Sequence, residues 1–147
     1  IAHLLPQEEP LTVVTTSLYI AQALSQRLEH TTIAVGGRVR PRTQGVVDMW
    51  AVDMLETMEL DLAFIGANGV TEPGYLTTPD PAVAEVKKAA IRVSSRQIFV
   101  GDHTKFGRHT FTRFGALSSF ECAITGKELG ESRAGRYRRG GAKLILV

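Results

Sequence analysis

The chain has 147 residues, of which 44% are hydrophobic and 22% charged, and its formal net charge is +2. These values predict one soluble globular domain, and the charge is too small to indicate nucleic-acid binding by itself. The single cysteine, Cys122, excludes a disulfide framework within the chain and favours a reducing compartment such as the cytoplasm. No apolar run approaches the ~20 residues of a membrane-crossing helix, so no membrane partner is expected.

The chain opens with a short helical pattern and then a strand. Residues 1–5 have the composition of a helix tail that Pro6 ends. A β-branched run at residues 11–14 predicts a strand, which is followed by a hydroxyl-rich turn at residues 15–17. Ser17 is a good helix N-cap. The apolar residues that then repeat at helical spacing are Ala21, Leu24 and Leu28.

A second strand is predicted at residues 31–35, and it ends in the pair Gly36-Gly37. Two adjacent glycines imply a tight turn or a close approach to other backbone. The basic segment at residues 38–42 is interpreted as a solvated connection, with a phosphate or partner contact as the alternative. From Val47 onward apolar residues recur at helical spacing, which predicts a helix with Trp50 and the methionines in the core.

Residues 61–92 combine a strand, a glycine-rich turn and a helix, and they form the centre of the predicted site. The apolar run at residues 63–65 predicts a strand that is buried on both faces. The turn at residues 66–69 follows its carboxyl end, which is where ligands bind in parallel sheets. Asp80 can cap the next helix and Pro81 fits its first turn, so the sequence predicts a pocket for a small anionic ligand. The apolar stripe of this helix is predicted to be Val83, Val86, Ala90 and Val93.

The alternation of strands, turns and helices continues to the end of the chain. Strands are predicted at residues 97–100, 122–124 and 143–147, with Cys122 packed in the core. Residues 128–139, with their arginines, are interpreted as an exposed, solvated helix. This order predicts an α/β fold with three layers, in which helices cover both faces of a largely parallel sheet. The polar turns should then gather on one edge of that sheet.

Several motifs of catalysis and metal binding are absent, including a P-loop, GxGxxG, HExxH, CxxC and GxSxG, so no metal or cofactor is predicted. Asp102 and Lys105 can bind a sugar hydroxyl and a phosphate, with a surface ion pair as the alternative. Lys87 lies beside the apolar stripe of its helix, and the sequence leaves open whether it faces the pocket or the solvent. Lys88 is expected to be solvated. Asp80 is interpreted first as a helix cap and then as a ligand contact.

Six polar segments follow one another in a distinctive order and spacing. They are Thr15-Thr16-Ser17, Gly36-Gly37-Arg38-Val39, residues 61–69 (DLAFIGANG), residues 77–80 (TTPD), residues 86–89 (VKKA) and residues 102–107 (DHTKFG). This series resembles the carboxy-terminal sensor domain of DeoR-type bacterial transcriptional regulators over nearly the whole chain.

The resemblance implies a fold similar to ribose-5-phosphate isomerase and the CoA-transferases. It implies a phosphorylated sugar or related metabolite as effector, an amino-terminal winged helix-turn-helix that binds operator DNA, repression as the commoner role, and a homo-oligomer. By this resemblance the effector-binding residues would be Thr16, Ser17, Gly36, Gly37, Gly66, Asn68, Asp80, Lys87, Asp102 and Lys105.

Two departures from the family pattern are visible. Thr16 stands where the family usually has an asparagine, so the choice of effector is expected to differ. The first strand of the family's domain and its glycine–threonine turn have no counterpart in residues 1–147. We therefore interpret residues 1–147 as a sensor domain that lacks its first strand and the DNA-binding domain, with an incomplete phosphate cradle.

Two other functions compete with the sensor interpretation. A sugar-phosphate isomerase of the same fold needs a base that moves a proton between two carbons, and Asn68 cannot serve as that base. Glu72 lies in an arm flanked by proline and glycine, which leaves Asp102 as the strongest carboxylate candidate. The third function is an oligomerisation module with a vestigial pocket. The sequence favours the sensor, without catalysis.

Overall fold

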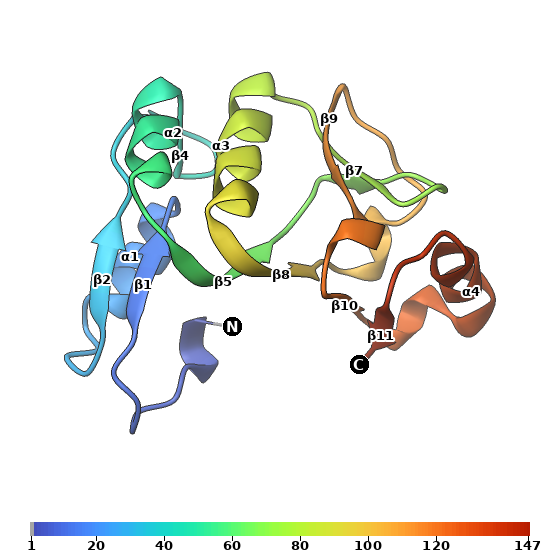
Figure 1. Cartoon of the computed structure of the whole chain (residues 1–147), viewed down its shortest axis with the longest axis horizontal. Helices are drawn as coiled ribbons and strands as arrows, with labels where there is room; N and C mark the ends of the chain where they lie inside the picture. The colour runs from blue at the N-terminus through green and yellow to red at the C-terminus, as the bar shows by residue number, and fades with distance from the viewer. Residues whose placement is uncertain (1) are drawn as a thin grey trace. The chain divides into compact units, whose positions relative to one another are not determined.

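The computed structural model describes residues 2–147, which divide into two compact units at Ile1–Leu55 and Glu56–Val147. Each unit contains parallel strands and helices (Figure 1), which confirms the predicted α/β class. None of the helices within residues 2–147 has the length and apolar character needed to cross a membrane.

The first unit is built on two parallel strands, β1 (Thr12–Thr15) and β2 (Thr31–Ala34), with the helix α1 (Leu18–Leu24) between them in the chain. The Ser17 side chain accepts a hydrogen bond from the backbone N–H of Ile20, which confirms the predicted N-cap. The helix ends at Leu24, so Leu28, predicted on its apolar stripe, is 95% exposed instead. The helix tail predicted at the start is a 3₁₀ turn, Ala2–Leu4, and Ile1 lies outside the described residues.

The basic segment at residues 38–42 was predicted to be a solvated connection. It is largely exposed, as predicted, but most of it is a strand and not a loop. Its residues form β3 (Arg38–Arg40), which pairs antiparallel with β4 (Gly45–Val47). Gly37 has a φ of +143°, and a Cβ there would lie 2.7 Å from the Val47 carbonyl oxygen. The paired glycines therefore mark a close backbone approach, as predicted.

The helix predicted from Val47 onward is α2 (Met49–Glu56), but the prediction of its buried face is partly wrong. Ala51 and Leu55 are buried at a spacing of four residues, whereas Trp50 is 70% exposed and Met54 and Met58 are only partly buried. Trp50 is adjacent to Ala51 in the sequence, which places it about 100° around the helix from the buried stripe.

The second unit contains a parallel four-stranded sheet in the order β11-β10-β8-β5. Its strands are β5 (Leu60–Ile65), β8 (Ser94–Val100), β10 (Cys122–Thr125) and β11 (Leu144–Leu146). All four were predicted, although β8 begins earlier than expected. The prediction that the strand at residues 63–65 is buried on both faces is wrong for the described residues, because Ala63 and Ile65 are buried but Phe64 is 46% exposed.

A second sheet in this unit was not predicted. It is antiparallel, in the order β6-β7-β9, and its strands are β6 (Gly69–Val70), β7 (Tyr75–Thr78) and β9 (Thr112–Ala116). The helix α3 (Pro81–Arg92) packs against both sheets, and Figure 1 shows it on the same side of β5 and β8 as β7 and β9. Within α3 the buried residues are Ala84, Val86 and Ala89, so of the predicted stripe only Val86 is fully buried.

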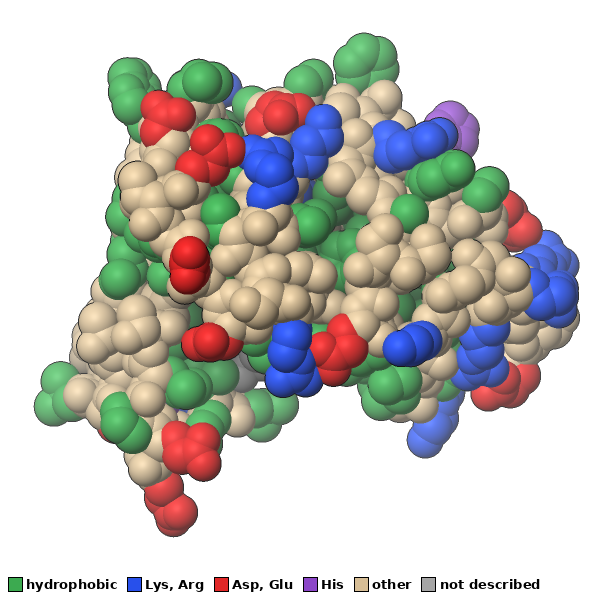
Figure 2. Space-filling view, viewed as in Figure 1, with side chains coloured by type: hydrophobic (Ala, Val, Ile, Leu, Met, Phe, Trp, Pro, Cys, Tyr) green, Lys and Arg blue, Asp and Glu red, His purple; other side chains and the backbone are tan. Residues whose placement is uncertain are grey.

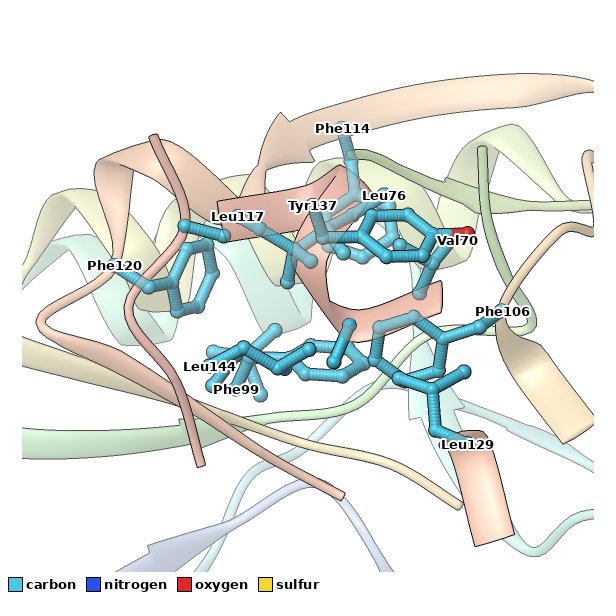
Figure 3. Close-up of a cluster of buried hydrophobic side chains, with 14 of the residues drawn as sticks. Val70, Leu76, Phe99, Phe106, Phe114, Leu117, Phe120, Leu129, Tyr137 and Leu144 are labelled. Atoms are coloured by element: carbon cyan, nitrogen blue, oxygen red, sulfur yellow. The ribbon is translucent and has the colours of Figure 1, made fainter. Parts of the chain in front are cut away.

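The hydrophobic core of the second unit joins its two sheets to the last helix, α4 (Glu131–Arg139). Phe99 contacts the ring of Phe106 edge to face, with the ring centroids 6.1 Å apart, and Phe106 contacts Tyr137 in the same way at 5.0 Å (Figure 3). Tyr137 is 1% exposed. The prediction of a wholly solvated helix is therefore wrong for the face that carries Tyr137, and Cys122 is only partly buried.

Candidate functional site

Lys87 and Gly66 meet at the carboxyl end of β5. The Lys87 ammonium group donates a hydrogen bond of 2.6 Å to the Gly66 carbonyl oxygen and lies 5.4 Å from the centroid of the Phe114 ring. Burial lowers the pKa of Lys87 from its ordinary 10.5 to about 8. No carboxylate among the described residues forms an ion pair with it. Lys87 is thus a buried cation without an anionic partner.

Asn68 lies in the same turn and is held by β7. Its backbone N–H donates to the Thr77 carbonyl at 3.0 Å, and its side-chain oxygen accepts a hydrogen bond of 3.0 Å from the Thr78 hydroxyl. Thr78 is 1% exposed, so this contact is buried. The sequence interpretation did not include Thr78 among the site residues, although the paired threonines of the TTPD segment were a visible signal.

Asp80 caps α3 as predicted. Its carboxylate accepts a hydrogen bond of 2.9 Å from the backbone N–H of Ala82, and Pro81 occupies the first turn. Helix α3 therefore begins three residues after Thr78. A contact between Asp80 and a ligand stays a prediction.

Asp102 and Lys105, predicted to act together, do lie next to each other. The Asp102 carboxylate accepts hydrogen bonds from the backbone N–H and the hydroxyl of Thr104, and it lies 3.4 Å from the Lys105 ammonium group. The hydrogen bond from Thr104 and the charge of Lys105 hold the pKa of Asp102 below its usual value. Lys105 is 34% exposed and Asp102 is 54% exposed, so both groups are accessible to solvent.

The glycine-rich turn and the loop of residues 102–107 run side by side. Ile65 pairs with Phe99 in the parallel sheet, so Gly66 and Val100 leave the same edge together. Further along, the Gly107 N–H donates to the Val70 carbonyl at 2.8 Å. Gly66, Asn68, Lys87, Asp102 and Lys105 therefore belong to one edge of the second unit, as the polar turns were predicted to do.

The far end of the 102–107 loop is held by two residues that the sequence interpretation did not identify. Gly107 N–H also donates to the Tyr137 hydroxyl at 2.9 Å, and Arg133 donates to the Phe106 carbonyl at 2.8 Å. Gly107 has a φ of +77°, a conformation that favours glycine. Arginines scattered among polar residues gave no sequence signal that Arg133 and Tyr137 face the loop.

The other predicted site residues belong to the first unit. Thr16 and Ser17 follow β1, and Gly36 and Gly37 follow β2; because Thr15 pairs with Ala34, the two turns leave the same edge of that small sheet. The Thr16 carbonyl accepts a hydrogen bond of 2.7 Å from the Val46 N–H. Effector binding by these four residues stays a prediction.

The polar groups gathered at this edge include two ammonium groups, an amide and hydroxyls. Within residues 2–147 no group of three or more His, Cys, Asp or Glu side chains is arranged to hold a metal. Basic and acidic side chains are interspersed on the face shown in Figure 2, where no broad basic surface is seen. Ammonium groups, an amide and hydroxyls at strand ends are instead the groups that recognise phosphate and sugar hydroxyls.

These features define an α/β domain of the class that places its ligand site at the carboxyl ends of parallel strands. Residues 1–127 match the family described as the DeoR C terminal sensor domain, and the chain belongs to this family. The resemblance recognised in the sequence is thereby confirmed.

Three relatives illustrate the similarity. The chain is 30% identical to the glycerol-3-phosphate regulon repressor of Escherichia coli over 125 residues, which cover 85% of the chain and 50% of the relative. It is 30% identical to the repressor of the same name from Haemophilus influenzae over 146 residues, covering 99% of the chain and 56% of that protein. It is 29% identical over 125 residues to the HTH-type transcriptional regulator GlpR of Haloferax volcanii, covering 85% of the chain and 49% of the relative. The chain thus spans about half the length of these relatives.

Proposed function

We propose that the chain is the effector-binding domain of a DeoR-type transcriptional repressor, and that its effector is a phosphorylated sugar or a related metabolite such as glycerol 3-phosphate. Membership of a sensor-domain family and the similarity to two glycerol-3-phosphate regulon repressors support the proposal. The observation that carries it is the largely buried ammonium group of Lys87, which forms no ion pair with a carboxylate in the described part of the chain.

A phosphate group would supply the negative charge that pairs with the ammonium group of Lys87. Burying an unpaired ammonium group destabilises the folded protein, and a bound oxyanion offsets this penalty through a charge-assisted hydrogen bond. Lys105, partly exposed, supplies a second positive charge on the same edge, and Asn68 and Asp102 offer hydrogen-bonding groups for sugar hydroxyls. Gly66, Asn68, Asp80, Lys87, Asp102 and Lys105 are proposed to form this site in the second unit. Effector binding by Thr16, Ser17, Gly36 and Gly37 of the first unit stays a prediction.

Binding at this site would regulate transcription through an equilibrium. We place the operator-binding helix-turn-helix in the part of the natural protein that precedes this chain, since the relatives are named as repressors and HTH-type regulators of about twice the length. The effector would shift a conformational or oligomeric equilibrium of a cytoplasmic homo-oligomer, and the size of that shift is limited by its differential affinity for the two states.

An isomerase of the same fold is the competing function, and the carboxylates of the second unit argue against it. The turn after β5 carries Asn68, an amide that cannot accept the proton, and Glu72 is paired with Arg136 at 3.2 Å. The Asp102 carboxylate is already occupied by Thr104 and has a lowered pKa, which makes it a weaker base. These features favour binding without turnover.

The test uses the full-length protein with glycerol 3-phosphate, a panel of sugar phosphates and their unphosphorylated counterparts. A ligand that binds only the folded state raises the melting temperature by mass action. We expect phosphorylated compounds alone to do so, and the effect to be lost in Lys87→Met. The matched control is Lys88→Met, because Lys88 lies next to Lys87 on α3 but is exposed and paired with Glu85 at 2.8 Å. Steady product formation would establish the isomerase instead. If no compound in the panel raises the melting temperature, the oligomerisation module is favoured.

A further inference from the structure

The last twenty residues of the chain contain a helix whose contacts point to a role in the site. The family match ends at residue 127, before α4 begins at Glu131. Yet Ala134 is fully buried, Tyr137 is 1% exposed, and the following strand β11 pairs with β10. Helix α4 is therefore part of the packed core of the second unit and is not a solvated appendage.

Two side chains of α4 make polar contacts with the same short stretch of backbone. The Tyr137 hydroxyl accepts the hydrogen bond from Gly107 N–H at 2.9 Å, and the Arg133 guanidinium donates to the Phe106 carbonyl at 2.8 Å. The Phe106 ring packs on the Tyr137 ring (Figure 3). Phe106 and Gly107 immediately follow Lys105, so these contacts fix the end of the loop that carries the Asp102–Lys105 pair.

The opposite side of the loop is fixed by the glycine-rich turn. Gly107 N–H also donates to the Val70 carbonyl, and a Cβ at Gly69 would lie 2.8 Å from the Arg108 carbonyl oxygen. The loop is therefore clamped between the turn that carries Asn68 and the helix that carries Tyr137. The Lys105 ammonium group is held by its ion pair with Asp102, which is partly exposed and weak.

We infer that α4 positions the 102–107 loop for effector binding, and that Tyr137 and Arg133 are positioning residues that act through Lys105. The inference rests on the proposed function of the site. Tyr137 and Arg133 do not touch the effector in this arrangement; they set the backbone from which the Lys105 ammonium group reaches it. Effector contact with Lys105 is in turn transmitted to α4, which links the site to the carboxy-terminal end of the chain.

The test combines Tyr137→Phe with Lys105→Ala in the full-length protein. Tyr137→Phe removes one hydroxyl and keeps the ring that packs on Phe106, while Gly107 N–H retains the Val70 carbonyl. We expect the affinity for glycerol 3-phosphate, or for the compound in the panel that binds best, to fall roughly threefold to tenfold, the effect of one hydrogen bond. In the Lys105→Ala background the same change should have almost no further effect, since residues that act together are not additive.

A purely structural role predicts a different outcome, in which Tyr137→Phe lowers the melting temperature but leaves the affinity unchanged or reduces it equally with and without Lys105. Either result would overturn the inference. Arg133→Met should reproduce the loss of affinity, and Arg139→Met, an exposed arginine on the same helix, should not. Failure of the wild-type protein to bind any compound would refute the proposed function as well. This outcome differs from one in which the wild-type protein binds and Tyr137→Phe binds equally tightly, which would refute only the role of Tyr137.

Discussion

The ammonium group of Lys87 lies 2.6 Å from the carbonyl oxygen of Gly66, and this contact connects the buried face of α3 to the turn after β5. It is a hydrogen bond to a neutral acceptor, so it does not neutralise the charge. Burial of the ammonium group lowers the pKa of Lys87 to about 8. A group of this kind makes both folding stability and anion binding depend on pH.

Folding stability should rise with pH between about 8 and about 10.5, the lowered pKa of Lys87 and its ordinary value. In this window the unfolded chain binds a proton at Lys87 and the folded chain does not, so raising the pH favours folding. A shift of this size corresponds to about 3 kcal/mol across the window. Denaturant unfolding over this range should show the rise in the wild-type protein and in Lys88→Met but not in Lys87→Met. Equal curves for all three proteins would contradict the assignment.

Effector affinity should fall as the pH rises through about 8, because only the charged form of Lys87 attracts the phosphate. The phosphate itself is already a dianion above about pH 7 and does not contribute to the change. Between about pH 7 and about pH 9 the charged fraction of a group with this pKa drops up to about tenfold. Titration calorimetry at both pH values measures this, with Lys87→Met expected to bind weakly and independently of pH. A wild-type affinity that is flat over this range would exclude Lys87 from the site.

The sequence was sufficient to predict the elements whose signals are local. Ser17 and Asp80 were identified as helix caps because a cap needs only a side-chain oxygen next to a helical pattern, and both cap their helices. The strands of the parallel sheet were visible as apolar runs that end in glycine or polar residues. Asp102 and Lys105 were paired correctly because a spacing of three residues brings them together in one turn.

The features that the sequence did not predict depend on partners distant in the chain. β7 pairs with β9 more than thirty residues away, and β6 has only two residues, so neither gives a local pattern. Trp50 is exposed because the buried stripe of α2 runs through its neighbour Ala51. Tyr137 contacts the 102–107 loop because of where α4 packs, and no local motif in its polar sequence indicates this contact.

Removing the cap of α3 should destabilise the second unit. Asp80→Ala loses the hydrogen bond to the Ala82 N–H and the favourable charge at the helix amino end, which together correspond to about 1–2 kcal/mol. Asp80→Asn keeps an oxygen acceptor at the cap and should recover most of this loss. Urea denaturation of the three proteins measures the difference. Equal destabilisation by alanine and asparagine would show that the carboxylate charge, and not the cap, is what matters.

Gly69 is the position in the glycine-rich turn where a side chain fits least. A Cβ added there would lie 2.8 Å from both the Arg108 carbonyl oxygen and the Thr77 hydroxyl. The Arg108 carbonyl belongs to the backbone directly after the 102–107 loop. Gly69→Ala must therefore push the loop away from the turn, which should lower the free energy of unfolding by about 1–3 kcal/mol. Gly36→Ala is the matched control, because a Cβ at Gly36 meets nothing within 4 Å. Thermal unfolding should show a clear loss of stability for Gly69→Ala and little change for Gly36→Ala. If the two alanine variants unfold at the same temperature, the close packing of the turn against the loop is not present in solution.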